Sequence, residues 1–447
     1  MSVCAGGLMR KNLLGRKILA LAVPSLGSLL AEPLMVLGDS AMIGHVGTEE
    51  LAGLTLASSI NVFLVGMCIF LVYTTTAVAA RKLGQGDQRG AVKAGIDGMW
   101  LATIVGSLLA LFVYISAPLL MGFFNASDGV YAQGVTYLRS SCWSLFPMAW
   151  VLAGTGALRG QLDTRTPFLI SMSGAVFNVG VNAILIFGAH LSVAGAGYGT
   201  SIASCAMGIA FIFRVTAGAR QCKTELRPHF SGIFNALCAG VPLMIRTLTM
   251  HIVIMGTTWV AASQGEVAVA GRQIANVTWG LTANILDALA IAAQALIGYE
   301  LGRGEKSRVR LLVRQLAVWG GGAGVVIGLV TVVAAPVWPC VFSSDVQVIQ
   351  AAMCALVVSA VFQPLAGIVF MYDGVLIGAN DSWYLAKAGV VNLALYTPAL
   401  WAVWVYAPQG ALGLAWLWAC YCGVFFAARW LTLSLRIRRD AWMGLKA

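Results

Sequence analysis

The sequence has 447 residues, of which 59% are hydrophobic and only 10% are charged, and its mean hydropathy is +0.85. A soluble protein of this length needs more charged surface than these residues supply, which excludes an ordinary globular protein. The net charge of +11 does not indicate nucleic-acid binding, because the basic residues form short clusters between apolar runs without aromatic interleaving. We therefore expect a polytopic membrane protein embedded in the lipid bilayer, with no nucleic-acid partner.

Apolar runs long enough to cross about 30 Å of hydrocarbon recur along the whole chain. Each must be helical in lipid, because unpaired backbone groups cost too much there, and the predicted fold class is therefore an all-α polytopic membrane protein. Breaks at glycine, proline, asparagine and charge clusters predict twelve spans, near residues 18–43, 51–80, 91–117, 130–157, 166–190, 192–214, 233–262, 267–299, 309–338, 346–376, 384–406 and 410–434.

The basic residues are unevenly distributed between the two sets of span ends. All 28 lysines and arginines lie at one set of ends except Arg139, Arg246 and Arg272. This is the positive-inside pattern, which predicts a multi-pass protein of the cell membrane with both termini in the cytoplasm. An even number of spans is consistent with that orientation.

A long internal repeat runs through the sequence. Residues 17–214 align on residues 235–432 without a gap, and five spans share this offset. The matched landmarks are Pro24 with Pro242, LGQGD at 83–87 with LGRGE at 301–305, and LRGQLDT at 158–164 with LIGANDS at 376–382. Each copy holds six spans, so the copies are predicted to be parallel and related by a pseudo-twofold axis along the membrane normal.

The repeat predicts three parts of the chain. We expect an N-terminal lobe at residues 1–214, a cytoplasmic linker at 215–232, and a C-terminal lobe at 233–447 with a short basic tail. Transporters use this architecture, with the substrate site between the halves and alternating access by rocking.

Few of the 17 acidic residues fall inside the predicted spans. A charge at mid-bilayer costs about 3 kcal/mol, so each such residue needs a partner, water or a proton. Asp39 and Glu32 are seven residues apart and share a helix face, and Pro33 between them can bend the helix. This arrangement suggests a titratable switch, although a carboxylate held by hydrogen bonds or placed at the outer interface would look the same.

Asn178 and Asn182 are four residues apart and share a face of the fifth span, where they fit either an ion site or interhelical hydrogen bonds. In the second lobe, Asp287 and Asp373 are candidates for substrate or accessory contacts. A structural alternative is that Arg246 or Arg139 neutralises one of these carboxylates.

The sequence contains no catalytic or cofactor motif. The four histidines are dispersed, no GxSxG, HExxH or Walker A pattern occurs, and the ten cysteines lack metal-ligand spacing. We expect no enzyme activity, no metal and no cofactor. Energy must then come from an ion gradient or from a partner, and one charge moving through 100 mV supplies roughly 2.3 kcal/mol.

Seven segments together resemble one family of transporters. They are PLMVLGDSAMIGHVGTEELAGL, ARKLGQGD, ALRGQLDT, FNVGVNAILIFG, VAGAGYGT, LDALAIAAQALIGYELGRG and DGVLIGANDS. Their order and spacing resemble the multidrug and toxic compound extrusion (MATE) family, in its DinF-like branch, from about residue 10 to 435. The resemblance implies twelve helices in two six-helix lobes, a V-shaped central cavity, and export of organic compounds against inward H+ or Na+.

The resemblance also implies a site. The family's first-helix Asp matches Asp39, and its N-lobe cation site matches Asn178, Asn182 and Thr200. The family has a carboxylate where this chain has Asn182, so we expect H+ coupling through Asp39 rather than Na+ binding at Asp39 and Asn178. The expected function is a monomeric secondary antiporter that exports amphipathic cationic compounds.

Three other functions fit parts of the sequence. A lipid-linked oligosaccharide flippase of related architecture would need several cationic residues in its cavity, and only Arg139 and Arg246 are intramembrane candidates. A membrane-embedded transferase would need clustered catalytic groups at one membrane face, which the sequence lacks. A non-transporting sensor is also compatible with the sequence.

Overall fold

The computed structural model describes residues 2–444, with side chains from Gly15 onward. Met1 and residues 445–447, which include Lys446 of the expected basic tail, lie outside the described residues. The side chains of Arg10 and Lys11, which contribute to the predicted orientation, also lie outside them.

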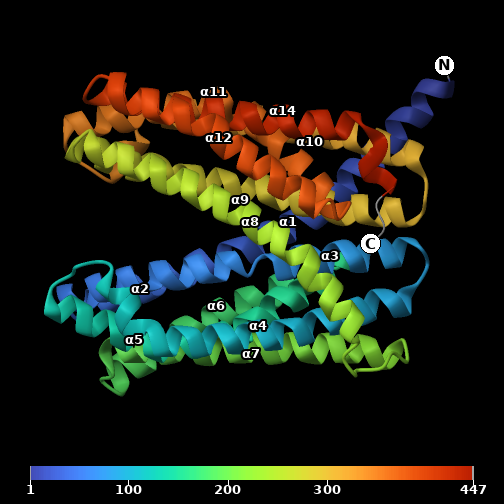
Figure 1. Ribbon diagram of the computed structural model, residues 1–447, viewed down its shortest axis with the longest axis horizontal. Helices are drawn as coiled ribbons and strands as arrows, with labels where there is room; N and C mark the ends of the chain where they lie inside the picture. The colour runs from blue at the N-terminus through green and yellow to red at the C-terminus, as the bar shows by residue number, and fades with distance from the viewer. Residues whose placement is uncertain (1, 445–447) are drawn as a thin grey trace. The chain divides into compact units, whose positions relative to one another are not determined.

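The described residues contain twelve helical stretches that are long and apolar enough to cross a membrane, which confirms the predicted number of spans. Their regular structure is entirely helical (Figure 1). The first six spans comprise α1 (Ser2–Gly44), α2 (Thr48–Met67) with α3 (Phe70–Gly84), α4 (Gln88–Gly122), α5 (Asp128–Gly160), α6 (Arg165–Ala183) with the π-helical turn η1 (Ile184–Gly188), and α7 (Ser192–Gln221).

The second six spans follow a connection at residues 222–229. They comprise α8 (Phe230–Ser263), α9 (Glu266–Gly302), α10 (Lys306–Ala334), α11 (Val346–Gly378), α12 (Ser382–Tyr406), and α13 (Ala411–Trp418) with the π-helix η3 (Ala419–Phe425) and α14 (Phe426–Arg438). Two short 3-10 helices, η2 (Trp338–Val341) and η4 (Asp440–Gly444), complete the described chain.

The second span differs from the single helix that the sequence predicts at residues 51–80. A break at Cys68 and Ile69 separates α2 from α3. The Cys68 N–H donates to the Leu64 carbonyl at 3.2 Å and to the Val65 carbonyl at 2.9 Å. This shared bond tightens the turn as a 3-10 helix does, and it interrupts the regular ladder without any proline or charge in the sequence.

The chain divides into two compact units. The N-terminal unit is Ala20–Val241, and the C-terminal unit is Met1–Leu19 together with Pro242–Ala447. Both divisions fall inside long helices, in α1 and in α8. Each of these two helices therefore supplies its first residues to one unit and its remaining residues to the other.

The sequence repeat appears in the backbone geometry. The helices α5 and α11 begin and end at residues that the repeat aligns with each other. Gly86 and Gly304 share positive φ angles of 79° and 77°, and the turn residues Leu162 and Asn380 share φ angles of 64° and 62°. Matched left-handed residues at matched turns confirm that the repeat is structural.

In the N-terminal unit, α5 packs against α2, α3, α4 and α7, and Figure 1 shows α4, α5 and α7 running alongside one another. An apolar cluster in this unit includes Ile43 of α1, Leu54 of α2 and Tyr137 of α5. This cluster buries the C-terminal end of α1, close to the candidate acid.

In the C-terminal unit, α11 packs closely against α9 and α10. Gly320, Gly324 and Gly328 form one face of α10, which we call the glycine seam. A Cβ atom on these three residues would lie 2.4, 2.3 and 2.6 Å from carbonyl oxygens of α11, so only glycine allows this approach. Small residues of this kind let helix backbones pack directly in membranes.

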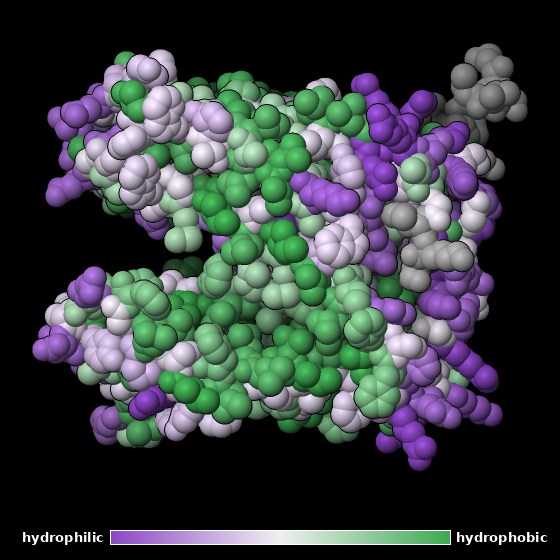
Figure 2. All heavy atoms as spheres, in the orientation of Figure 1, coloured by the Kyte–Doolittle hydropathy of each residue, from purple (hydrophilic) through white to green (hydrophobic). Residues whose placement is uncertain are grey.

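The surface of each unit has the polarity expected of membrane-spanning helices. Apolar side chains cover the middle of the helices, and hydrophilic side chains gather at their ends (Figure 2). Many large apolar side chains of α4, α10 and α12 are exposed, among them Leu108, Val330 and Trp401. Exposed residues of this kind are stable in contact with hydrocarbon.

Candidate functional site

Asp39 lies on the buried face of α1, and its side chain is only 3% exposed. Met35 and Ile43, one turn before and one turn after it, are buried on the same face. One carboxylate oxygen, Oδ1, accepts a hydrogen bond from Asn182 Nδ2, and the other, Oδ2, lies 3.2 Å from the hydroxyl of Thr200, which donates to it. The acid is therefore enclosed by α1, α6 and α7.

The two asparagines complete the cluster. Asn178 and Asn182 are fully buried on α6. The amide of Asn182 also donates to Asn178 Oδ1 at 3.4 Å, and Asn178 Nδ2 donates to Thr200 Oγ1 at 3.4 Å. The structure thus brings together the four residues to which the family resemblance assigns ion coupling, and we call them the Asp39 cluster.

Two local features position Asn182. The first is Gly199 of α7, where a Cβ atom would lie 1.6 Å from Asn182 Oδ1, so glycine is required for this approach. The second is η1, the π-helical turn that starts two residues after Asn182. Such turns recur at functional sites in helices. Within the described residues, Asn182 Oδ1 is buried and has no hydrogen-bond donor.

The charge of Asp39 is not compensated by a nearby cation. In the part of the chain that the structure describes, no lysine, arginine or histidine lies within ion-pair distance of it, and its partners are a neutral amide and a neutral hydroxyl. Neutral donors stabilise a buried carboxylate less than a cation does. Asp39 must therefore either bind a proton or a cation, which would weaken its hydrogen bonds, or remain ionised as a buried charge without a counter-ion.

Sequence reasoning missed Tyr137. This residue of α5 is 4% exposed and interacts electrostatically with Asp39 and with the Thr200 hydroxyl. The only signal was a tyrosine in the polar stretch TYLRSS, which does not indicate a neighbour on a helix far away in the sequence.

Glu32 does not join the Asp39 cluster. It lies two helical turns earlier, about 10 Å along the axis at 1.5 Å per residue, and it is half-buried. Pro33 lies inside α1, which continues as a helix from Ser2 to Gly44 through both Pro24 and Pro33. The proline that could bend the helix is thus six residues before the acid.

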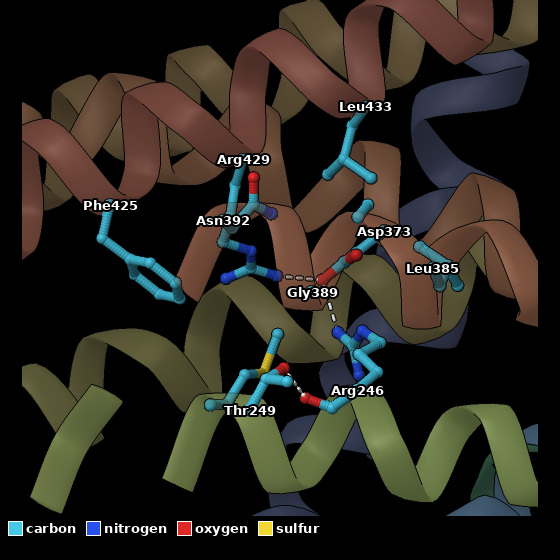
Figure 3. Close-up of a pocket in the computed structure, with 11 residues that line it drawn as sticks. Arg246, Thr249, Asp373, Leu385, Gly389, Asn392, Phe425, Arg429 and Leu433 are labelled. Atoms are coloured by element: carbon cyan, nitrogen blue, oxygen red, sulfur yellow. Dashed lines mark hydrogen bonds and ion pairs between the residues drawn. The ribbon is translucent and has the colours of Figure 1, made fainter. Parts of the chain in front are cut away.

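The second buried acid has very different surroundings. Asp373 of α11 is 6% exposed, and its Oδ2 accepts hydrogen bonds from Arg246 of α8 at 2.5 Å and from Arg429 of α14 (Figure 3). Both guanidinium groups are also buried. We call these three residues the arginine triad. The alternative that Arg246 neutralises a carboxylate is confirmed for Asp373, whereas Arg139 lies over the ring of Tyr114 at 5.8 Å.

Arg429 is more buried than the sequence suggests. We expected it at the cytoplasmic ends with the other basic residues, which stays a prediction, and its side chain is only 6% exposed inside the C-terminal unit. Its guanidinium packs over the rings of Phe425 and Phe426 at 5.7 and 5.2 Å. Burial is possible because Asp373 and two aromatic faces replace the water around the cation.

The triad lines a small cavity together with Thr249 and Asn392 (Figure 3). Its volume of about 10 Å³ has room for about one water molecule. The third acid of this lobe, Asp287, is half-buried in the middle of α9. Among the described residues there is no group of three His, Cys, Asp or Glu side chains that could hold a metal ion.

The fold and the two buried acids define a polytopic membrane transporter made of two six-helix repeats. The chain belongs to the MATE family, because the family model described as MatE matches residues 24–184 and 242–399. The two matches begin at Pro24 and Pro242, which the repeat aligns with each other. The chain is thus a MATE-family efflux transporter of multidrug and toxic-compound type, and not an enzyme. MATE transporters move small organic substrates coupled to ion gradients.

Relatives agree with this assignment over nearly the whole chain. Protein DETOXIFICATION 44, chloroplastic, from Arabidopsis thaliana is 26% identical over 96% of this chain and 82% of its own length. DNA damage-inducible protein F from Escherichia coli is 26% identical over 91% and 93%, in line with the expected DinF-like branch. The Vibrio cholerae MATE transporter VcmN in its bent form superposes with a TM-score of 0.86 at 24% identity, covering 97% of this chain and 99% of that one.

Proposed function

We propose that the chain exports amphipathic, cationic organic compounds in exchange for protons that bind Asp39. The observation that carries the proposal is the isolation of this acid: it is 3% exposed in a membrane-spanning helix, and its hydrogen-bond partners are neutral. A carboxylate in that setting is more stable when a proton or a cation removes its charge. A proton and a cationic substrate then compete for one negative charge, which is the requirement for exchange.

Asn182 supports a proton rather than Na+ as the coupling ion. A carboxylate at this position would give the cluster two negative charges with which to bind a metal cation. With the amide of Asn182, Asp39 is the one carboxylate of the cluster. The amide also turns an N–H toward Asp39, and this donor would have to leave before a cation could approach that oxygen. Hard cations such as Na+ favour several oxygen ligands.

The amide of Asn182 can serve both protonation states of Asp39. In the structure its N–H donates to the acid, which suits the carboxylate form. Rotation of the amide would turn the Oδ1 atom, which has no donor within the described residues, toward a protonated Asp39 as an acceptor. Loading and unloading the proton would then exchange one hydrogen bond between Asn182 and Asp39 for another.

The remaining parts of the proposal concern topology. We infer that the protein lies in the cell membrane with both termini in the cytoplasm and works as a monomer by alternating access. The support for the orientation is the placement of all but three of the 28 basic residues at one set of span ends. The assignment to a transporter family sets aside the transferase and favours small organic compounds over lipid-linked oligosaccharides.

Transport in proteoliposomes tests the coupling directly. Efflux of a fluorescent organic cation is measured under an imposed pH gradient and, separately, under an imposed Na+ gradient. We expect the pH gradient alone to drive export, and Asp39→Asn to abolish it while the protein stays inserted and monodisperse. Asp128→Asn, which changes an exposed acid at the start of α5, is the matched control and should transport at the wild-type rate. Wild-type rates from Asp39→Asn would refute the assignment of the coupling residue.

A further inference from the structure

The C-terminal unit holds a larger cavity at the end where α10 begins and α14 ends, and the proposed function does not use it. Its volume is about 440 Å³, within the range of roughly 300–1,000 Å³ that small-molecule sites occupy. Three arginines and one acid line this cavity together with apolar side chains. The charged residues are Arg310, Arg314, Arg438 and Asp440. We call the cavity the Arg314 cleft.

The C-terminal segment forms the apolar part of the Arg314 cleft. The chain leaves α14 at Arg439, whose φ of −93° and ψ of 110° are extended, and it then turns back as η4. Trp442 of η4 is 1% exposed, and its Nε1 donates to the Ile437 carbonyl at 3.2 Å. Both residues line the cleft with Met443 and with Val313 of α10. This part of the cavity is therefore held in place by burial and a hydrogen bond.

The charges of the cleft do not cancel. Arg310 donates to Asp440 through Nε, at 3.3 Å, and through Nη2. Arg314 and Arg438 are exposed, and no carboxylate of the described chain lies within ion-pair distance of either. Three cations and one carboxylate leave the cleft with a net charge of +2. Because a planar guanidinium binds phosphate through two parallel hydrogen bonds, two arginines without a carboxylate partner in one cavity favour a phosphate ligand.

The fold does not require arginine at these positions. The repeat aligns Arg310 and Arg314 with Val92 and Ile96 of α4, which are 2% and 4% exposed. Ile96 lines a cavity of about 410 Å³ in the N-terminal unit, and the residues that line this second cavity, all within the described chain, are uncharged. Cavities of similar size thus lie at matching places on α4 and α10, and the one on α10 is basic. Arginines where the other copy packs apolar side chains indicate a function.

The cleft lies at the level of the headgroups of a bilayer. α10 has 29 residues and is about 43 Å long, close to the roughly 40–45 Å of a bilayer with its headgroups. Arg310 and Arg314 lie about 6 and 12 Å from the start of this helix, and their long side chains can extend toward the headgroups. Exposed apolar residues follow on the same helix faces. Val318 is 73% exposed one turn after Arg314, and Leu431 is 48% exposed two turns before Arg438.

We propose that the Arg314 cleft binds an anionic phospholipid. The phosphate group accepts hydrogen bonds from Arg314 and Arg438, and the acyl chains lie on the exposed apolar residues of α10 and α14. A soluble phosphate compound leaves these apolar faces uncovered, and a zwitterionic lipid brings a second, positive charge to a basic cleft. These helix ends are the ones that we place in the cytoplasm, where anionic lipids give the membrane surface its negative potential.

Native mass spectrometry of the full-length protein in a non-ionic detergent tests the proposal. Phosphatidylglycerol is titrated and compared with phosphatidylcholine of the same acyl chains. We expect phosphatidylglycerol to bind about tenfold more tightly than phosphatidylcholine, and the double variant Arg314→Gln/Arg438→Gln to lose this advantage. Arg220→Gln/Lys223→Gln removes the same charge from exposed residues at the end of α7 and just after it. It is the matched control and should bind phosphatidylglycerol as the wild type does.

Further measurements separate a lipid from other sources of phosphate and from general charge. Glycerol 3-phosphate, which lacks acyl chains, should compete only at concentrations about a hundredfold above those of the lipid. Equal affinities for the two would assign the cleft to a soluble phosphate compound and overturn the lipid assignment. Equal losses of affinity in the two double variants, or equal binding of the two lipids to the wild type, would show that the proposal is wrong.

Two single variants sharpen the test. Arg314→Lys keeps the charge and loses the planar fork, so phosphatidylglycerol should bind about threefold more weakly. Wild-type affinity in this variant would exclude bidentate binding by Arg314. Asp39→Asn should bind the lipid as the wild type does, because the cleft contains no residue of the Asp39 cluster. Failure of the proposed coupling therefore leaves the lipid site standing, and failure of lipid binding leaves the coupling standing.

Discussion

The two buried aspartates are similar in exposure and opposite in surroundings. Asp39 is 3% exposed among neutral amides and a hydroxyl, whereas Asp373 is 6% exposed between two guanidinium groups. Among the described residues no cation lies within ion-pair distance of the first carboxylate, whereas the second forms ion pairs with two arginines. Burial alone therefore does not identify a coupling acid. The sign of the neighbouring groups decides whether the acid can exchange a proton.

The repeat extends this comparison. It aligns Asp39 with Thr257 of the second copy, and it aligns Asp373 with Thr155 of the first copy. Both threonines are buried, at 4% and 7% exposed. Each unit thus has a threonine where the other has its acid. The two copies kept matching turns and diverged in which of the two aligned positions carries the acid.

Of the two buried aspartates, Asp373 in the arginine triad should contribute more to the free energy of unfolding. Asp373→Asn leaves two buried guanidinium groups on a neutral amide, which should cost about 3–5 kcal/mol of unfolding free energy. Asp39→Asn, with no cation beside it, should change the unfolding free energy by less than about 1 kcal/mol. Denaturation of both variants in detergent measures the difference. Equal stabilities would contradict the contrast between the two acids.

A methyl group at Gly199 should disturb the Asp39 cluster without touching its polar residues. The Cβ of Gly199→Ala would lie 1.6 Å from Asn182 Oδ1 and displace the amide. We expect a cost of about 1–3 kcal/mol and a fall in proton-driven export of about tenfold. Gly218→Ala, on the same helix with no atom within 4 Å of the added Cβ, is the control and should keep wild-type export. Equal rates in both variants would remove Asn182 from the mechanism.

A second carboxylate in the cluster should change the coupling ion. Asn182→Asp places two acids side by side, and a bound cation relieves their repulsion. We expect Na+ to stimulate export about tenfold in this variant, which corresponds to about 1.4 kcal/mol, and to leave the wild type unchanged. Asn61→Asp adds the same charge at an asparagine that donates to Ser141 Oγ instead, and it should remain insensitive to Na+. The assay is efflux at fixed pH over a range of Na+ concentrations.

Thr200 should have the smallest effect, because its hydroxyl is one donor of two. Thr200→Val removes the 3.2 Å bond to Asp39 Oδ2 and should cost about 1 kcal/mol, seen as roughly a fivefold change in the proton concentration that gives half-maximal export. Thr200→Ser keeps the hydroxyl and should behave as the wild type. If Thr200→Val reduced export more than Gly199→Ala does, Thr200 would matter more to the mechanism than Asn182, contrary to our proposal.

Much of the fold follows from the sequence because hydrocarbon imposes simple rules. Apolar length predicts the twelve spans, and the constant offset of the repeat predicts the paired turns at Gly86 and Gly304. The break at Cys68 and the two π-helical segments escaped prediction, since they arise from local hydrogen bonds with no proline to mark them. These features depend on how each helix packs, which periodicity does not specify.

The site was only partly predictable for a related reason. The spacing of Asn178 and Asn182 places them on one helix face, but their approach to Asp39 and Thr200 followed only from the family resemblance. The burial of Arg429 escaped prediction because counting charges along the chain cannot tell that its guanidinium reaches Asp373. Tyr137 was missed because contacts between helices far apart in sequence leave no trace in one sequence.

The glycine seam between α10 and α11 restricts how the C-terminal unit can change shape. The two backbones touch through Gly320, Gly324 and Gly328, with no layer of side chains between them that could repack. A shift of α10 by one residue along its helix axis would push a side chain into a peptide carbonyl of α11. The two helices are therefore expected to move together as one rigid body. Conformational change in this half would then fall on looser partners, such as α12 and the widened turns of η3.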